Sequence, residues 1–351
     1  MNASESPLIR LTELAHGGGC GCKVAPGVLR EILSSGGGAL IPPQLLVGIE
    51  TADDAAVYAL NERQAIVATT DFFMPIVDDP FDFGAIAATN ALSDVYAMGA
   101  TPIFALAIVG MPVAKLPPAT IRRILDGGQS VCTRAGIPLA GGHTIDTVEP
   151  IYGLVAIGVV DPKRIKRNAG ARAGDSLILG KPLGIGVYGA ALKRGALADD
   201  RYRVMLDSTT RLNTPGVALA ELAEVHALTD VTGFGLLGHL LEMCRAAKIG
   251  ATVKFARLPF HPGVPQLVCE GFVTGASKRN FDGYGSEVML SADLGDVERT
   301  LLTDPQTSGG LLVACAPQAE QDVLAIFRRE GFADAAVIGR FDAGAPVVRV
   351  T

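Results

Sequence analysis

The sequence predicts an α/β protein built from two domains. Apolar, strand-like runs alternate with helical segments in both halves of the chain, which indicates α/β or α+β layering. The chain has 351 residues, more than one hydrophobic core usually organises, and 49% of them are hydrophobic. A basic cluster at 163–172 changes the composition. We therefore expect an N-terminal arm (1–49) and two domains, at 50–162 and 163–351.

In the first half, β-branched apolar runs predict strands, while Pro and Gly mark helix ends. Asp79–Pro80 opens the longest helix and Gly99 stops it. Asp71 is expected at the end of the first strand. The predicted strands cover 64–70, 103–109 and 151–160, and the predicted helices cover 26–34, 80–99 and 117–135.

The second half repeats this mixture. A glycine pattern at 184–189 formally matches a dinucleotide fingerprint, but no second strand ending in an acidic residue follows, so it predicts a helix start. Lys181 does not belong to a Walker loop, since Pro182 stands where Ser or Thr is required. Strands are predicted near 176–180, 224–229, 251–255, 310–315 and 335–341, and helices near 186–194, 214–223, 233–247 and 317–330.

Composition excludes several classes of protein. A net charge of −6 and a pI near 5.4 argue against a nucleic-acid-binding surface. Six scattered cysteines and no secretion signal predict a reduced, cytoplasmic location. The run at 95–114 is uncharged and 20 residues long, but glycines and prolines divide it into a helix end, a turn and a strand. We therefore expect no membrane span.

The stretch HGGGCGCK at 16–23 carries two thiols and an ammonium group on a glycine-rich loop. A cation such as Lys23 beside Cys20 or Cys22 favours the thiolate, which is the reactive form. The glycines allow the backbone to approach a ligand closely. The alternative is a frayed chain end that happens to contain two cysteines.

Acidic residues stand close to predicted strands. Asn90 and Asp94 are four residues apart and share one face of the 80–99 helix. Carboxylates together with substrate phosphates are the usual ligands of Mg²⁺. Each aspartate alone is more typical of a cap or turn, whereas several together favour a metal cluster. The others are Asp53, Asp54, Asp71, Asp230 and Asp304.

Glycine-rich turns accompany these acids at 141–144, 231–235 and 304–310. Successive backbone N–H groups in such turns, and at helix starts, bind anions. His143 is either a phosphate contact or an ordinary polar turn residue.

Seven segments spread over nearly the whole chain identify a family. They are GCGCK at 19–23, DDAAVY at 53–58, TTDFFMPIVDDPFDFG at 69–84, ATNALSDVYAMG at 88–99, AGGHTID at 140–146, TDVTGFGLLGH at 229–239 and DPQTSGG at 304–310. Together, in this order, they resemble selenophosphate synthetase (selenide, water dikinase). The wider superfamily, with aminoimidazole ribonucleotide synthetase and thiamine-monophosphate kinase, shares the aspartate segments but lacks the loop with Cys and Lys.

The resemblance implies conversion of selenide, ATP and water into selenophosphate, AMP and orthophosphate, which supplies selenium for selenocysteine and selenouridine. It implies a two-domain aminoimidazole ribonucleotide synthetase-like fold. The N-terminal mixed sheet would pair with a second copy into a dimer barrel, and the C-terminal domain would be an α/β sandwich. ATP as substrate, several Mg²⁺ ions, a homodimer and a selenium-delivery protein as partner follow from the same resemblance.

The resemblance also assigns residues by motif. Cys20 and Lys23 are the catalytic pair, and Cys22 is a less critical second thiol. The implied metal ligands are Asp54, Asp94 and Asp230. The implied ATP contacts are Lys23, Thr51, Ala52, Asp53, Asp71, Asp94, Gly142, His143 and Thr144.

Cys20 has three conceivable roles: holding selenium, acting as a base, or helping the loop close over the site. A soft thiolate on a movable arm favours selenium handling. Two other functions stay open. One is a small-molecule kinase of the same superfamily that produces ADP. The other is a carrier that binds a soft ion through Cys20 and Cys22, although two cysteines without further ligands make a poor zinc site.

Overall fold

The computed structural model describes residues 9–24, 28, 32, 41–49 and 52–351. The helix predicted at 26–34 therefore falls almost entirely outside the described residues. Two short 3₁₀ turns, η1 (Leu11–Leu14) and η2 (Gly19–Cys22), belong to the arm. Further 3₁₀ turns are η3 (Pro162–Arg164), η4 (Asn168–Gly170), η5 (Phe255–Arg257), η6 (Gly285–Glu287) and η7 (Pro317–Ala319).

The first domain is built on a six-stranded mixed sheet in the order β1-β2-β3-β6-β4-β5. All neighbouring strands run antiparallel except β4 and β5, which are parallel. The strands are β1 (Leu45–Val47), β2 (Ala56–Asn61), β3 (Gln64–Phe73), β4 (Thr101–Met111), β5 (Leu139–Asp146) and β6 (Ile151–Val160).

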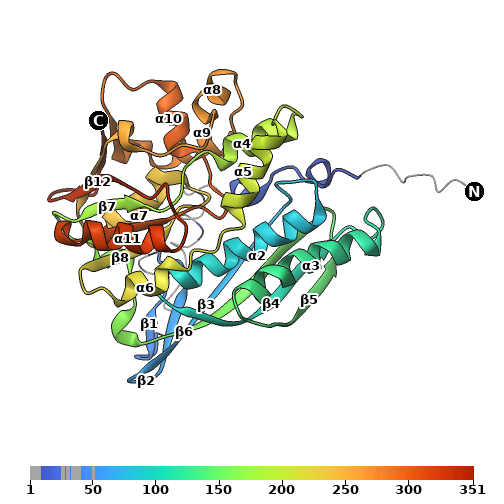
Figure 1. Ribbon diagram of the computed structural model, residues 1–351, viewed down its shortest axis with the longest axis horizontal. Coiled ribbons are helices and arrows are strands. Elements are labelled where there is room, and N and C mark those ends of the chain that lie inside the picture. The colour runs from blue at the N-terminus through green and yellow to red at the C-terminus, as the bar shows by residue number, and fades with distance from the viewer. Residues whose placement is uncertain (1–8, 25–27, 29–31, 33–40, 50–51) are drawn as a thin grey trace, which may run out of the picture.

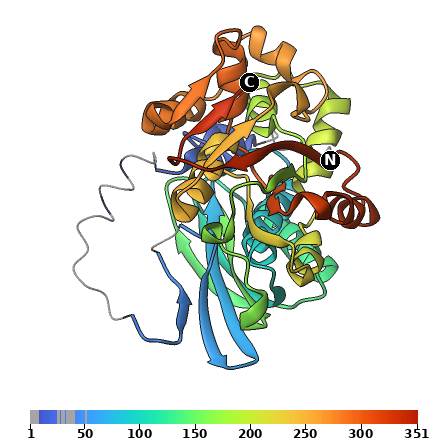
Figure 2. The same cartoon turned by 90° about the vertical axis from the view of Figure 1, so that its left-hand side faces the viewer.

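Helices α2 (Pro80–Ala97) and α3 (Pro118–Arg134) lie side by side over one face of this sheet (Figure 1). As predicted, Pro80 occupies the first turn of α2, and the Asp79 side chain caps it by accepting a hydrogen bond from the Asp82 amide. Gly84 lets the two helices approach closely, since a Cβ there would lie 1.8 Å from the Ile124 carbonyl oxygen. Of the helices whose bounds the structure describes, none covers the opposite face of the sheet (Figure 2).

The second domain is built on a seven-stranded sheet in the order β10-β13-β9-β12-β7-β11-β8. Its strands are β7 (Ser176–Leu179), β8 (Val225–Asp230), β9 (Gly250–Val253), β10 (Val288–Leu290), β11 (Leu311–Cys315), β12 (Ala336–Asp342) and β13 (Val348–Val350). Its helices are α4 (Ile185–Lys193), α5 (Asp199–Thr209), α6 (Pro215–Glu221), α7 (Gly235–Ala247), α8 (Val264–Cys269), α9 (Gly275–Tyr284), α10 (Asp296–Thr303) and α11 (Glu320–Arg329).

Helices cover both faces of this second sheet. Leu177 and Leu179 of β7 point toward the α7 side, whereas Ile178 packs with Phe327 of α11 on the other side. This alternation along one continuous apolar strand is typical of a sheet buried on both faces. A further buried cluster includes Cys20 of the arm, Val95 of α2 and Val187 of α4, so it joins the two domains.

Most predicted elements are confirmed, including β6 at its predicted bounds and a helix start at the glycine pattern. Three predictions were wrong. Asp71 lies inside β3 rather than at its end. The segment 139–146 is strand β5, not a turn, because Gly142 allows close pairing: a Cβ there would lie 2.1 Å from the Ala107 carbonyl oxygen. Asp304 was expected at the end of an apolar strand that includes Leu301 and Leu302, but these two residues belong to helix α10, and Asp304 follows that helix.

The uncharged run at 95–114 is divided between the end of α2 and strand β4. In the part of the chain that the structure describes, no helix is both long and apolar enough to cross a bilayer.

Candidate active site

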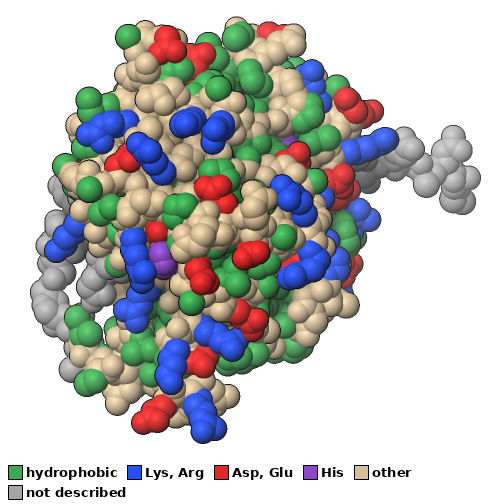
Figure 3. All heavy atoms as spheres, turned by 60° about the vertical axis from the view of Figure 1, so that its left-hand side comes forward, with side chains coloured by type: hydrophobic (Ala, Val, Ile, Leu, Met, Phe, Trp, Pro, Cys, Tyr) green, Lys and Arg blue, Asp and Glu red, His purple; other side chains and the backbone are tan. Residues whose placement is uncertain are grey.

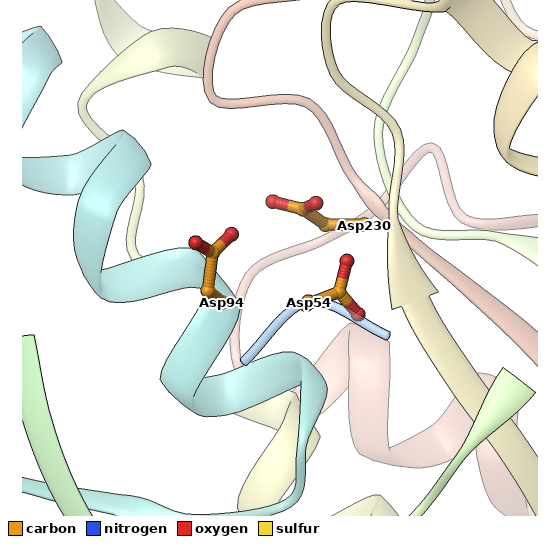
Figure 4. Close-up of side chains that lie close together, drawn as sticks. All are labelled: Asp54, Asp94 and Asp230. Carbon is orange, nitrogen blue, oxygen red and sulfur yellow. The ribbon is translucent and has the colours of Figure 1, made fainter. Parts of the chain in front are cut away.

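Three predicted metal ligands come together between the domains. Asp54 lies two residues before β2, Asp94 projects from α2 and Asp230 ends β8, and their carboxylates point into one shared space (Figure 4). One oxygen from each lies within 4.8 Å of the others. Asp54 Oδ2 is buried and has no hydrogen-bond partner. An all-oxygen set with one unpartnered oxygen fits a hard divalent cation such as Mg²⁺.

The electrostatics of this cluster favour a bound cation. Burial raises the pKa of Asp54 well above its ordinary value, and the charges of Asp230 and Asp94 raise it further. Burial likewise raises the pKa of Asp94 well above its ordinary value, and repulsion from the charges of Asp230 and Asp71 raises it further. Buried carboxylates this close to one another cannot all ionise without a compensating positive charge. A divalent cation supplies that charge.

Asn90 connects the cluster to the arm. Its Nδ2 donates to Asp71 Oδ2 over 2.7 Å, while its Oδ1 accepts hydrogen bonds from the Cys20 thiol (3.2 Å) and the Ser308 amide (2.7 Å). Asn90 and Asp94 therefore both face the site, as their four-residue spacing predicts. Asn90 was not among the assigned site residues, although that spacing was the signal that could have included it.

The glycine-rich loop is packed between the domains rather than frayed. The Gly19 amide donates to the Met74 carbonyl oxygen (2.9 Å), and the Cys20 amide donates to Thr307 Oγ1 (3.1 Å). The Arg279 guanidinium donates to the Gly21 carbonyl oxygen (3.2 Å). The Cys20 side chain is only 1% exposed. Contacts from both domains thus hold the thiol at the carboxylate cluster.

The prediction that Lys23 makes Cys20 a readier thiolate was wrong for this closed arrangement. Burial raises the pKa of Cys20 well above its ordinary value, and the negative charge of Asp71 adds to this. Lys23 lowers the pKa of Cys20, but by less than those two effects raise it. The thiol therefore stays protonated while the arm is docked in this way.

Lys23 itself remains a cation. Burial lowers the pKa of its ammonium group, but the nearby carboxylates, Asp71 first and then Asp94 and Asp230, outweigh burial and raise it overall. Its Nζ lies 3.9 Å from Asp71 Oδ2 and 5.9 Å from the centre of the Phe234 ring. The site thus holds one fixed positive charge beside its acidic groups.

Three of the predicted ATP contacts, residues 142–144, lie apart from this cluster. Gly142 shares a row of the sheet with Asp71, through Leu154 and Ala107, which separates the two by three strand spacings, or about 14 Å. Gly142, His143 and Thr144 are exposed on the edge strand β5.

The segment before β2 is tied to the second domain. Asp53 Oδ1 accepts a hydrogen bond from the Asn168 amide (2.6 Å), and the Ala52 carbonyl oxygen accepts one from Asn168 Nδ2 (2.9 Å). Ala52 has a φ of +50°, an unusual backbone conformation for a residue other than glycine. Thr51 lies outside the described residues.

Comparisons with known proteins agree with this architecture. Family models described as "AIR synthase related protein, N-terminal domain" and "AIR synthase related protein, C-terminal domain" match residues 52–160 and 172–350. Selenide, water dikinase of Pseudomonas straminea is 63% identical over 353 residues, covering 99% of this chain and 98% of the relative. That of Paraburkholderia xenovorans (strain LB400) is 64% identical over 347 residues, with the same coverage. The chain belongs to the selenide, water dikinase family.

Solved structures show the same fold at lower identity. Thiamine-monophosphate kinase from Stenotrophomonas maltophilia K279a is 23% identical, with a TM-score of 0.63, covering 88% of this chain and 91% of that one. A HypE–HypF complex chain is 19% identical, with a TM-score of 0.67 and coverage of 92% and 95%. The chain therefore shares its mixed α/β fold with these two proteins.

The turn at 304–310 contacts the arm instead of lying open for an anion. Asp304 is absent from the carboxylate cluster formed by the described residues. Its Oδ2 accepts hydrogen bonds from the Gly186 (3.0 Å) and Val187 (3.3 Å) amides at the start of α4. The glycine pattern that mimicked a nucleotide fingerprint thus binds an internal carboxylate. Thr307 and Ser308 of the same turn contact Cys20 and Asn90, roles that sequence reasoning missed.

Proposed function

We propose that this chain synthesises selenophosphate from selenide, ATP and water and releases AMP and orthophosphate. The observation that carries the proposal is the position of Cys20 and Lys23, docked against Asn90 and Asp71 at the edge of the carboxylate cluster. A phosphoryl-transfer site and a thiol thereby share one enclosed space. A superfamily kinase has no use for the thiol, and an ion carrier has no use for the carboxylates.

We propose that Asp54, Asp94 and Asp230 hold Mg²⁺, with Asp71 beside them. Mg²⁺ at such a site neutralises phosphate charge and fixes the orientation of ATP. Lys23 adds a positive charge that accommodates charge developing on the transferred γ-phosphoryl group. The docked arm covers the site and excludes water, so that selenide rather than water accepts the first phosphoryl group.

We assign Cys20 to selenium handling. Its sulfur is aimed at Asn90 and is a softer donor than any other group in the cluster, which suits a soft nucleophile. The raised pKa of the buried thiol makes it a poor general base while the arm is docked. Ala52, Asp53 and residues 142–144 remain predicted nucleotide contacts. For the last three to bind ATP, a nucleotide anchored at the carboxylates would have to extend along the sheet to β5.

We propose that the chain is a homodimer formed through the uncovered face of the first sheet. Alternate residues of the long strands place apolar side chains there, and no helix with described bounds covers them. Contiguous apolar patches on a protein surface mark sites of interaction with a partner. Residues on this face, by strand register, are Tyr58, Ile66, Phe72, Phe104, Leu106, Ile108, Ile145, Val155 and Ile157.

We also propose a cytoplasmic location and a selenium-delivery protein as partner. All six cysteines are free, as in a reducing compartment. On the face drawn in Figure 3, acidic side chains lie between the Lys and Arg side chains, so this face offers no uninterrupted basic surface for a nucleic acid.

Phosphorus NMR of the protein with ATP and Mg²⁺, with and without selenide under anaerobic conditions, tests the function. Selenide-dependent AMP, orthophosphate and a selenium-coupled phosphorus signal are the expected products. ADP as the stable end product would favour the superfamily kinase. Unchanged ATP in every condition would favour the carrier.

A further inference from the structure

A cavity beside the cysteine loop is lined by none of the three aspartates of the carboxylate cluster. Its volume is about 360 Å³, and Gly17, Gly18 and Gly21 of the loop form one wall. Thr307 also lines it, and the Thr307 hydroxyl accepts the hydrogen bond from the Cys20 amide. The cavity therefore reaches the backbone of Cys20, while the Cys20 sulfur points the other way, toward Asn90.

Three basic side chains line this cavity: Lys193 at the end of α4, Arg194 directly after it, and Arg279 on α9. None of the described residues that line it is acidic. Thr274 and Gly275, which also line it, form the N-terminus of the ten-residue helix α9, whose dipole adds positive potential. In a chain with a net charge of −6, this is a locally positive, concave site.

The three cations are held in place differently. Lys193 Nζ donates to the Ala15 carbonyl oxygen (3.1 Å) and Arg279 to that of Gly21 (3.2 Å), so both also contact the arm. Arg194 donates to the Gly271 carbonyl oxygen (3.1 Å) and lies 5.3 Å from the centre of the Phe272 ring. None of the contacts found for Arg194 involves the arm. Substituting Arg194 therefore changes the charge of the cavity without removing a contact that docks the loop.

We propose that this cavity binds the hydroselenide anion before it reaches Cys20, an inference that rests on the proposed function. The two substrates are both anions, and the acidic cluster with its metal serves the polyphosphate. A separate positive site at the same loop, lined by none of the aspartates of the cluster, would receive the small anion apart from the polyphosphate. The glycines on either side of Cys20 make this wall flexible enough to move when hydroselenide passes from the cavity to the Cys20 thiol.

Steady-state kinetics under anaerobic conditions test the proposal. Arg194→Gln should raise the KM for selenide by roughly three- to tenfold, with the KM for ATP and kcat near those of the unaltered protein. The kcat/KM for selenide should also lose part of its dependence on ionic strength, which a purely structural role would not change. Lys278→Gln is the matched control, since Lys278 precedes Arg279 on α9, is 81% exposed and pairs with Asp282.

Equal KM values for selenide in Arg194→Gln and Lys278→Gln would overturn the proposal. The proposal would also be overturned if Arg194→Gln changed only the product inhibition by orthophosphate, because the cavity would then bind the product rather than the substrate. Calorimetric titration of hydroselenide in the absence of ATP should show weaker binding to Arg194→Gln than to the unaltered protein. This titration reports on the cavity even if the unaltered protein makes no selenophosphate, and equal binding there also contradicts the proposal.

Discussion

At the scale of single residues, Asn90 has the most connected position in the site. Its carboxamide donates to Asp71 and accepts from both the Cys20 thiol and the Ser308 amide, so one planar group orients three different segments. An aspartate at this position could not donate to Asp71, and an alanine would leave buried polar partners unsatisfied. The thiol's orientation therefore depends on a residue of α2 that is remote in sequence.

Replacing Cys20 by serine should abolish selenophosphate formation while ATP binding survives. The hydroxyl can still donate to Asn90, so the arm keeps its contacts, but it lacks a soft donor for selenium. The measurements are phosphorus NMR for product and calorimetry for ATP. Cys269→Ser, at an exposed thiol, is the control and should behave like the unaltered protein. Loss of nucleotide binding in Cys20→Ser would contradict the assignment.

Asp94→Asn should stabilise the metal-free protein by about 1 kcal/mol, because it removes one of several buried charges that repel one another. The asparagine Oδ1 can still accept the hydrogen bond from the Thr69 hydroxyl. Denaturant unfolding in the presence of a chelator measures the effect. The same variant should gain less stability from added Mg²⁺ than the unaltered protein. An equal gain would remove Asp94 from the metal ligands.

At the scale of elements, the contact between the 304–310 turn and the start of α4 places the turn that anchors Cys20. Gln306 Oε1 accepts hydrogen bonds from the Gly184 (3.0 Å) and Ile185 (3.1 Å) amides, beside the bonds that Asp304 accepts. Gly186 has no substitute here, because a Cβ would lie 2.4 Å from Asp304 Oδ1. The start of this nine-residue helix thus holds segment 304–310 in place. That segment in turn places Thr307 against the arm.

Stability should fall as the pH rises from about 4 to 7, in part because of Asp304. Burial raises the pKa of this carboxyl from 3.8 to about 7 in the folded protein. The folded state therefore binds a proton more tightly than the unfolded state, and the stabilisation is lost as the pH rises through this window. Asp304→Asn should flatten that part of a plot of unfolding free energy against pH. Asp322→Asn, at an exposed position on α11, should leave the plot unchanged.

The sequence was sufficient to predict helices and strands whose ends are marked by local residues such as a capping Asp followed by Pro. Asp79–Pro80 fixed the start of α2, and the continuous apolar run fixed β6. It was insufficient where long-range contacts decide. Gly141 and Gly142 look like a turn locally, and only pairing with β4 makes them a strand. Asp304 looks like another metal ligand, and only the fold shows that a helix N-terminus binds it instead. Burial likewise reversed the expected shift in the Cys20 pKa.

At the scale of the whole molecule, the uncovered face of the first sheet should control the oligomeric state. Phe72 lies on this face and is 48% exposed in the single chain. Phe72→Asp would bury a charge in the proposed dimer contact, so sedimentation should show a shift from dimer to monomer with unchanged circular dichroism. Met289→Asp, at a 57% exposed position in the second domain, should remain dimeric. A Phe72→Asp dimer of unchanged affinity would rule out this face.

The burial of Cys20 has a consequence for survival under oxidative stress. Oxidants attack thiolates that solvent can reach, and this sulfur is both protonated and 1% exposed while the arm is docked. Oxidative damage then requires the arm to move away from the site, and the proposed passage of hydroselenide to Cys20 requires the same loop to move. The thiol is therefore shielded in the resting enzyme and exposed during turnover. Inactivation by peroxide should depend on the number of catalytic cycles rather than on the time of exposure.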